Sequence, residues 1–336
     1  MGKVLLIGGA GYVGSVLAES LLARGLSVRV FDSLIYGNNS SPLALRNQEN
    51  YEFQYGDMAN RQSLEKALVD VADVVILAGL VGEPICNSYP SEAERINYTA
   101  IRHAAEVIAC HRLNSAIFIS TCSNYGLTPE SDRASEAYPL APLSSYAEAK
   151  VAAERSFLGV MQSGQVIKPV VLRFATAFGL SPRMRFDLTV NEFTRNLFLG
   201  KDLEVFDPDT WRPYCHVADF ARLVEKVLTA DSKTVAFEVF NAGGDLNNHT
   251  KREIIDIISE HRLPGRVEFI SGGRDPRNYR VDFGKVRATL DFEPEHSVRF
   301  GVQELIVALK QNLFPDRPRS VNQLGNYELE QVAGNA

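Results

Sequence analysis

Short apolar runs alternate with longer amphipathic stretches along the first 175 residues of the chain. In the amphipathic stretches apolar residues recur at helical spacing, and the helix expected over residues 91–111 carries them on one stripe, as a helix that covers a sheet requires. The apolar runs are short and rich in β-branched residues, so they predict strands at 4–7, 28–31, 74–77, 116–119 and 170–174. This alternation predicts an α/β fold with a Rossmann-type, doubly wound parallel sheet.

The pattern changes after residue 179, where loops containing Arg and Pro separate shorter expected helices, over 187–199, 251–261 and 298–312. Segments 217–228 and 235–241 again have the character of a helix and a strand of the first domain. The large domain is therefore expected in residues 1–175 with return segments in 217–245. A smaller α/β lobe is expected in 176–216 and 246–314, and the polar residues 315–336 are interpreted as a surface tail.

Composition and charge exclude several classes of protein. A chain of 336 residues exceeds the usual size of one core, which agrees with two lobes. The formal net charge is −6, and the charged residues are interspersed along the chain. This pattern does not indicate a binding surface for nucleic acid or an anionic membrane, and it favours a small-molecule partner. The four cysteines form no C-x-x-C pair and the histidines do not cluster, so neither a metal site nor a disulfide framework is expected.

The sequence also carries no expected targeting or membrane segment. Met1 leads directly into a short apolar run that Gly8 interrupts, which is too short for a signal peptide. No later stretch approaches about 18 consecutive apolar residues, the length that a membrane-spanning helix needs. We therefore expect a cytoplasmic protein.

A glycine-rich turn follows the first expected strand and opens a helix. Residues 8–14 read GGAGYVG, which has the spacing G-x-x-G-x-x-G. Glycines in this context let the backbone approach a diphosphate, and the helix N-terminus supplies N–H donors and a positive dipole. An ordinary strand-to-helix turn is the alternative. The dinucleotide interpretation makes Gly8, Gly11, Tyr12, Val13 and Gly14 cofactor-binding residues.

An acidic residue ends the second strand, where a dinucleotide needs one. Asp32 lies 18 residues after Gly14, so its carboxylate can accept hydrogen bonds from the adenosine ribose hydroxyls and would repel a 2′-phosphate. This predicts NAD rather than NADP, although a turn-forming Asp is the alternative. Asp57 and Met58 follow a further strand, the third along the chain, which is expected between the apolar runs at 28–31 and 74–77. They are placed near the adenine, although a loop cap is equally compatible with Asp57.

A phenol and an ammonium share one helical face. Tyr146 and Lys150 are at i and i+4, a pair that any helix can show by chance. The fifth strand ends at Thr121, with Ser123 shortly after it, and delivers their hydroxyls to the edge of the sheet where the dinucleotide is expected. The combination is more specific than either part.

The chain resembles the extended short-chain dehydrogenase/reductases that modify nucleotide sugars, from Gly8 to about Leu309. The resemblance implies that Thr121, Tyr146 and Lys150 form the catalytic triad. Residues 81–86 and 179–185 resemble a subgroup that contains nucleotide-heptose C4 dehydrogenases. Further cofactor residues implied by the resemblance are Leu77, Ala78, Gly79, Asn97 and Phe174.

The same resemblance implies a nucleoside-diphosphate-sugar substrate and a homodimer. Asn191, Arg212 in the stretch 211–217, and Arg277 in the motif Asp275-Pro276-Arg277 match elements that hold the substrate diphosphate. A planar guanidinium suits this task because it binds phosphate oxygens bidentately. The alternative for either arginine is a surface charge. The substrate pocket is also expected to contain Val81, Thr121 and Ser123.

The expected chemistry is hydride transfer at the sugar C4 through a 4-keto sugar. Tyr146 acts as a phenolate, and Lys150 together with the cationic nicotinamide ring lowers the tyrosine pKa. A 4-epimerase is favoured, with a C4 dehydrogenase or 4-ketoreductase as the alternative and a catalytically silent dinucleotide-sensing regulator as the alternative of another class. The acidic residues that follow the triad Ser/Thr in 4,6-dehydratases are replaced by Cys122 and Ser123. Cys122 is interpreted as a small buried hydrophobe rather than a catalytic thiol.

Overall fold

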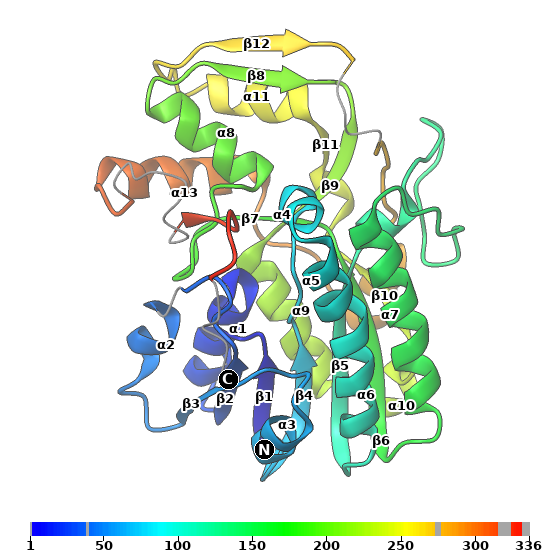
Figure 1. The fold of residues 1–336 in the computed structure, drawn as a ribbon. Coiled ribbons are helices and arrows are strands. Elements are labelled where there is room, and N and C mark those ends of the chain that lie inside the picture. Colours follow the sequence, from blue (N-terminus) through cyan, green and yellow to red (C-terminus); the bar gives the residue numbers. More distant parts are fainter. Residues whose placement is uncertain (1, 38–39, 273–276, 315–323, 331–336) are drawn as a thin grey trace.

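Seven parallel strands form the central sheet of the computed structural model, which describes residues 2–37, 40–272, 277–314 and 324–330 (Figure 1). Their order is β10-β6-β5-β4-β1-β2-β3, and every neighbouring pair runs parallel. The sheet confirms the predicted fold class. The strands are β1 (Lys3–Ile7), β2 (Val28–Asp32), β3 (Tyr51–Tyr55), β4 (Val71–Ile76), β5 (Leu113–Thr121), β6 (Val166–Phe174) and β10 (Val239–Ala242).

Helices cover both faces of this sheet because its strands are apolar on both sides. Alternate residues of β1 enter different cores: Val4 and Leu6 pack with α1 (Tyr12–Ala23) and α9 (Val217–Thr229), whereas Leu5 and Ile7 pack on the opposite face. The helices of that opposite face are α3 (Arg61–Ala67), α6 (Ile101–Ala109) and α7 (Ser145–Met161).

The chain returns to the large sheet after residue 217. Helix α9 packs against α1, and β10 pairs with β6 at the edge of the sheet. The expected strand over 235–241 begins later than predicted, since α10 (Ser232–Val235) forms a helical turn that the Asp231 side chain caps. Phe237, with a φ of 62°, then reverses the chain before β10 begins. Helices α2 (Ser40–Leu45) and α12 (Gly284–Leu290) complete this part of the fold.

The helix expected over 91–111 is divided rather than continuous. It consists of α5 (Pro90–Glu94), a π-helical turn (Arg95–Ala100) and α6. The wider turn contains Asn97, whose side chain is fully buried and bonded to backbone. A hydrophobic pattern alone does not distinguish this local widening from a regular helix. The short helix α4 (Glu83–Ser88) precedes α5.

The small lobe has two sheets of its own and a separate apolar core. Strands β7 (Thr176–Phe178), β9 (Trp211–His216) and β11 (Asn248–Thr250) form one sheet, and β8 (Leu203–Phe206) pairs in parallel with β12 (Val267–Ile270). The surrounding helices are α8 (Thr189–Phe198), α11 (Lys251–Ser259) and α13 (Val298–Lys310). No helix in the described ranges is long and apolar enough to cross a membrane.

Residues 324–330, here named the C-terminal segment, do not form the surface tail expected for 315–336. The Leu324 carbonyl accepts from Phe186 N at 2.7 Å in the small lobe, and Glu330 N donates to the Ile35 carbonyl at 2.9 Å in the large domain. The segment therefore joins the two lobes (Figure 1). The remaining parts of the expected tail, 315–323 and 331–336, lie outside the described residues.

Candidate active site

A cavity of about 710 Å³ lies between the two lobes at the carboxyl ends of the central strands. This is the edge where an open parallel sheet offers loops and helix N-termini to a ligand. Both lobes line it. Of the residues proposed from sequence for cofactor, substrate and catalysis, all line the cavity except Asn97 and Asn191. The two residues that precede Arg277 in its motif, Asp275 and Pro276, lie outside the described residues.

The glycine turn between β1 and α1 leaves room for a ligand at the helix N-terminus. Gly8 has a φ of +82°, and a Cβ there would lie 2.5 Å from Ala78 N, so only glycine fits. A Cβ on Gly14 would lie 2.6 Å from Gly9 Cα. Gly11 caps α1, and no side chain bonds to the amides of the first turn. These N–H groups are therefore available to a phosphate.

Asp32 closes the same end of the cavity from the tip of β2. Its carboxylate accepts from Ala10 N at 3.0 Å and from Leu34 N at 2.8 Å. These bonds fix the side chain beside the glycine turn. Burial raises the pKa of Asp32 above its usual range, an effect that the backbone donors oppose.

Two further segments proposed for the cofactor, residues 57–58 and 77–79, also line the cavity. Met58 is buried, and Asp57 pairs with Arg95 at 3.0 Å. Residues 77–79 follow β4 and also line the cavity. A Cβ on Gly79 would lie 3.1 Å from Asn97 Oδ1 and 3.4 Å from Lys150 Nζ, so a larger residue would crowd both groups.

Asn97 supports the backbone of the cavity wall without lining the cavity itself. Its Oδ1 accepts from Leu80 N at 2.7 Å, and its Nδ2 donates to the Leu80 carbonyl at 2.9 Å. The side chain is fully buried and does not line the cavity. In this structure Asn97 therefore holds the backbone that leads from Gly79 to Val81.

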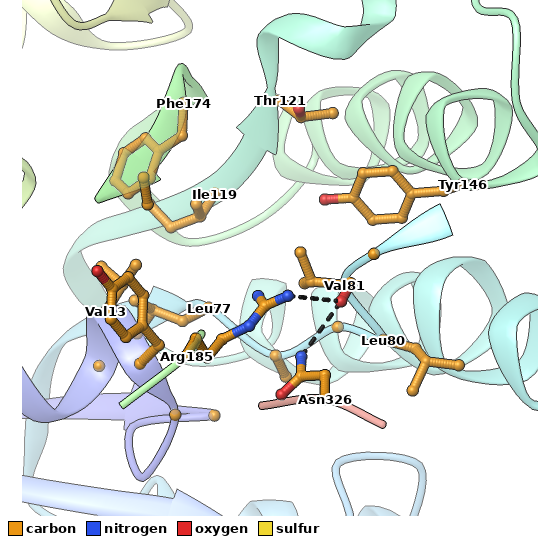
Figure 2. Close-up of a pocket in the computed structure, with 18 of the residues that line it drawn as sticks. Val13, Leu77, Leu80, Val81, Ile119, Thr121, Tyr146, Phe174, Arg185 and Asn326 are labelled. Atoms are coloured by element: carbon orange, nitrogen blue, oxygen red, sulfur yellow. Dashed lines mark hydrogen bonds between the residues drawn. The ribbon is translucent and has the colours of Figure 1, made fainter. Parts of the chain in front are cut away.

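The three residues of the proposed triad converge on one wall. Figure 2 shows the Tyr146 ring extending from α7 with its hydroxyl directed into the cavity, near Thr121 at the end of β5. Thr121 Oγ1 accepts from Ser123 N at 3.1 Å. One turn after Tyr146, Lys150 Nζ donates to the Ile119 carbonyl at 3.0 Å and lies 4.9 Å from the centre of the Phe118 ring. Phe174 and Ile119 form the adjoining apolar wall.

Burial dominates the electrostatics of this wall. It lowers the pKa of Lys150 to about 8, and it raises the pKa of Tyr146 above its usual value. Cys86 adds to the rise at Tyr146, whereas Arg185 and Arg277 oppose it. Desolvation of the phenolate thus outweighs the effect of both arginines. The lowered tyrosine pKa expected from Lys150 together with the cationic nicotinamide ring stays a prediction.

Cys122 is withdrawn from the cavity. Its side chain is fully buried, and its thiol donates to the Arg173 carbonyl at 3.1 Å. Burial raises the thiol pKa well above its usual range, which suppresses the thiolate. Ser123 does line the cavity, and its hydroxyl lies 3.2 Å from the Tyr279 hydroxyl.

The arginines proposed for the substrate diphosphate reach the cavity from the small-lobe side. Arg277 pairs with Glu83 at 3.0 Å. The guanidinium of Arg212 lies 5.1 Å from the centre of the Tyr279 ring and donates to the carbonyls of Trp211 and Arg277. Their location in the cavity excludes the interpretation of both residues as ordinary surface charges.

Asn191 has a different position from the one expected. It is fully buried on α8, outside the cavity lining. Its Oδ1 accepts from Gly179 N at 3.0 Å, and its Nδ2 donates to the Tyr12 hydroxyl at 3.1 Å and the Arg185 carbonyl at 2.9 Å. Asn191 therefore ties the loop before α8 to the start of α1.

The cavity wall also contains residues that were not assigned from the sequence, among them Arg183, Arg185, Tyr36 and Asn326. Arg185 pairs with Asp187 at 2.5 Å, and its Nη2 also donates to the Val81 carbonyl at 3.2 Å. Asn326 Nδ2 donates to the same carbonyl at 3.2 Å (Figure 2). The sequence signal for the first two residues was a pair of arginines separated by one residue. No motif in the neighbouring sequence distinguishes Asn326 as a cavity residue.

Comparison with known proteins assigns the chain to a family. The model of the NAD dependent epimerase/dehydratase family matches residues 4–243. The chain belongs to this family. The resemblance seen in the sequence is confirmed, and so is NAD as the cofactor of an enzyme of the extended short-chain dehydrogenase/reductase type.

Individual relatives are distant but similar over nearly their whole length. A dTDP-glucose 4,6-dehydratase from Streptomyces niveus is 27% identical over 92% of this chain and 93% of its own length. A UDP-glucuronate 4-epimerase from Thermodesulfobacterium geofontis is 27% identical over 93% and 98%. A solved UDP-glucuronic acid 4-epimerase from Bacillus cereus, in complex with UDP-glucuronic acid and NAD, has a TM-score of 0.81 at 24% identity and covers 93% of this chain and 100% of that one. This last likeness shows the fold.

The residues of this family member fit NAD. Gly8 and Gly11 have no side chains that would cover the amides at the start of α1, so these amides can bind a diphosphate. The Asp32 carboxylate lies beside the same turn, where it accepts from Ala10 N. In the described ranges no group of three or more His, Cys, Asp or Glu side chains is placed to hold a metal ion.

We expect Asp32→Ala to shift cofactor preference toward NADP. The carboxylate would face a 2′-phosphate, and like charges about 4 Å apart repel by roughly 4 kcal/mol at an effective dielectric constant of 20. The NAD-to-NADP affinity ratio, measured by titration calorimetry, is expected to fall by about tenfold or more, where each tenfold is about 1.4 kcal/mol. Asp57→Ala is the control and should leave the ratio unchanged. Equal affinity of the unaltered protein for both dinucleotides would contradict the role of Asp32.

Proposed function

We propose that the protein is a nucleoside-diphosphate-sugar 4-epimerase that works through a 4-keto sugar. The observation that carries this proposal is the convergence of Thr121, Tyr146 and Lys150 on a cavity that Arg212 and Arg277 enter from the other lobe. The cavity can hold a sugar ring against Tyr146 together with a diphosphate near the arginines. The UDP-glucuronate 4-epimerase among the relatives supports the same substrate class.

The chain's residues supply acid–base chemistry and orientation. Tyr146 removes the proton from the sugar 4-hydroxyl and later returns it, and Thr121 holds the same oxygen by a hydrogen bond. Lys150 is fixed by the Ile119 carbonyl at the rear of this wall, and its positive charge favours the phenolate. NAD, when bound, would supply the hydride acceptor and donor for this chemistry. Epimerisation also requires the keto sugar to present its other face before the hydride returns.

Elimination of water, as in 4,6-dehydratases, is disfavoured by the residues that follow Thr121. Those enzymes place acidic side chains there, whereas this chain has Cys122 and Ser123. The buried Cys122 thiol bonds to the Arg173 carbonyl and has no route to a substrate. This argues for epimerisation over dehydration, although a relative of each type matches the chain at 27% identity.

The deciding experiment incubates the purified protein with a panel of UDP-, dTDP- and GDP-sugars and follows both sugar products and absorbance of reduced dinucleotide. A 4-epimerase interconverts C4 epimers without net reduction of NAD. A C4 dehydrogenase accumulates a keto sugar and reduced dinucleotide instead, and a silent regulator binds without turnover. Either of these two results would overturn the proposal. The homodimer implied by the resemblance stays a prediction, for which the molecular mass in solution is the measurement.

Arg277→Ala is expected to weaken sugar-nucleotide binding by about 10- to 100-fold, because a charged hydrogen bond contributes about 1.5–3 kcal/mol. Dinucleotide affinity should stay unchanged, and Arg212→Ala should behave in the same way. Arg280→Ala is a matched control, since Arg280 stacks on Trp211 and does not line the cavity. The measurement is titration of the NAD-loaded protein with UDP-sugar. Unchanged affinity in both cavity variants would remove the arginines from the substrate site.

A further inference from the structure

Arg183 is a buried cation that the proposed reaction does not use. It lies in the loop between β7 and α8, is 3% exposed, and contributes to the cavity wall. Its Nη2 donates to the Gly325 carbonyl at 3.1 Å, and its guanidinium lies 5.0 Å from the centre of the Tyr36 ring. Its Nη1 is buried and has no hydrogen-bond partner in the part of the chain that the structure describes.

Arg183 has no ion-pair partner among the described residues, although the carboxylates of Asp187 and Asp32 favour its charge from a longer distance. Arg185, two residues later, has its own carboxylate partner in Asp187, whereas no described carboxylate forms an ion pair with Arg183. Burial and repulsion by Arg185 lower the pKa of Arg183 to about 10, so the group is still charged at neutral pH. A buried unpaired charge is strongly unfavourable, which makes an anion at this place favourable.

A second unsatisfied donor lies beside Arg183. The Tyr36 hydroxyl is buried without a hydrogen-bond partner among the described residues, although its ring contacts the guanidinium. Nearly all buried polar groups in proteins are hydrogen-bonded, so two neighbouring exceptions call for a ligand. Hydroxyl and guanidinium both donate, and the ligand that satisfies both is an oxyanion.

The position of this pair identifies which anion it meets. Tyr36 follows Asp32 by four residues, and Arg183 follows Ser181 by two. The Ser181 hydroxyl donates to the Tyr12 carbonyl at 2.7 Å and lies 2.9 Å from the Ser15 hydroxyl, so this loop is fastened to the first turn of α1. That turn is where the dinucleotide diphosphate is expected. The arginines proposed for the substrate, by contrast, come from β9 and the segment beginning at residue 277.

We propose that Arg183 and Tyr36 bind the phosphate oxygens of NAD, so that the small lobe supplies the counter-charge of the cofactor diphosphate opposite the glycine turn. The C-terminal segment contributes to this arrangement, because its Gly325 carbonyl accepts from Nη2 and leaves Nη1 for the ligand. The cofactor diphosphate is then held from two sides, by α1 amides of the large domain and by a side chain of the small lobe.

The test measures binding to dinucleotide-free protein by titration calorimetry with NAD, ADP-ribose and UDP as probes. Arg183→Met removes the charge while keeping most of the side-chain length. We expect it to weaken NAD and ADP-ribose equally, by about 10- to 100-fold, and to leave UDP affinity unchanged. Tyr36→Phe removes one hydrogen bond but no charge of the protein, and it should weaken the same two ligands by a smaller factor of about 2- to 10-fold.

Arg195→Met is the matched control, because Arg195 is a buried arginine of the same lobe that stacks on Phe186 outside the cavity lining. Its affinities for all three probes should equal those of the unaltered protein. If Arg183→Met fails to fold, Arg183→Lys and Tyr36→Phe carry the test, since both retain the buried volume approximately. Unchanged affinity for NAD and ADP-ribose overturns the proposal. A loss confined to UDP also overturns it and assigns Arg183 to the substrate diphosphate.

Discussion

Tyr146→Phe is expected to lower turnover by about 10² to 10⁴, the usual contribution of general acid–base catalysis. The substitution removes only the titrating oxygen and keeps the ring that packs on the cluster around Leu80 and Ile85. Fold and dinucleotide affinity should therefore stay unchanged. The measurement is single-turnover reduction of bound NAD, followed by absorbance after mixing with the nucleotide sugar that the panel identifies.

Two further variants make this expectation specific. Thr121→Val should have a milder effect than Tyr146→Phe, because it removes one hydrogen bond to the reacting oxygen and leaves the base in place. Cys122→Ala should retain turnover, since the thiol is buried and bonded to the Arg173 carbonyl. Near-normal turnover of Tyr146→Phe together with an inactive Cys122→Ala would show that the proposed mechanism is wrong.

Lys150→Met is expected to stabilise the dinucleotide-free protein while impairing catalysis. Burial lowers the pKa of Lys150 from 10.5 to about 8, so the charged form is less favourable in the folded than in the unfolded chain. A difference of that size corresponds to roughly 3 kcal/mol at 1.36 kcal/mol per pKa unit, partly offset by the lost bond to the Ile119 carbonyl. The free energy of unfolding in urea is the measurement, with a net gain of about 1–3 kcal/mol expected at pH 7.

The pH dependence of this gain provides an internal control. Below about pH 8 the lysine is charged in both states, so the whole advantage of Met is present. Between pH 8 and 10.5 the folded protein releases its proton first, and the advantage declines. Above the unfolded pKa of 10.5 both states are neutral and the advantage is lost. A gain that did not change with pH, or a destabilised variant at pH 7, would contradict the assignment of Lys150 as a buried charge.

Most strands of the central sheet could be predicted because each combines a short apolar run with a flanking turn, whereas β3 reads YEFQY and is not such a run. Tertiary contacts account for the errors. The expected strand over 235–241 lost its first residues to a helical turn that Asp231 caps and to the positive φ of Phe237. The expected helix over 91–111 widens at Asn97, whose amide bonds to the Leu80 backbone 17 residues earlier. Hydrophobic periodicity carries no information about such partners.

Candidate site residues could be predicted where the residues of a motif lie close together in the sequence. The glycine turn, Asp32 and the pair Tyr146 and Lys150 each show their spacing within one element or one βα unit. Asn191 was expected to face the substrate but bonds inside the small lobe and to α1, because residue type alone does not reveal side-chain direction. Asn326 was missed since it follows a polar stretch and reaches the cavity only through the contacts of the C-terminal segment.

The C-terminal segment makes the cavity dependent on residues that are synthesised after both apolar cores. All seven strands of the central sheet and the helices on its two faces precede residue 314, so both lobes have their apolar cores before residues 324–330 emerge. A chain that lacks residues 324–330 keeps those cores but loses the Gly325 carbonyl that accepts from Arg183 and the Asn326 amide that donates to the Val81 carbonyl. The binding cavity is thus completed only after both apolar cores are present in the chain.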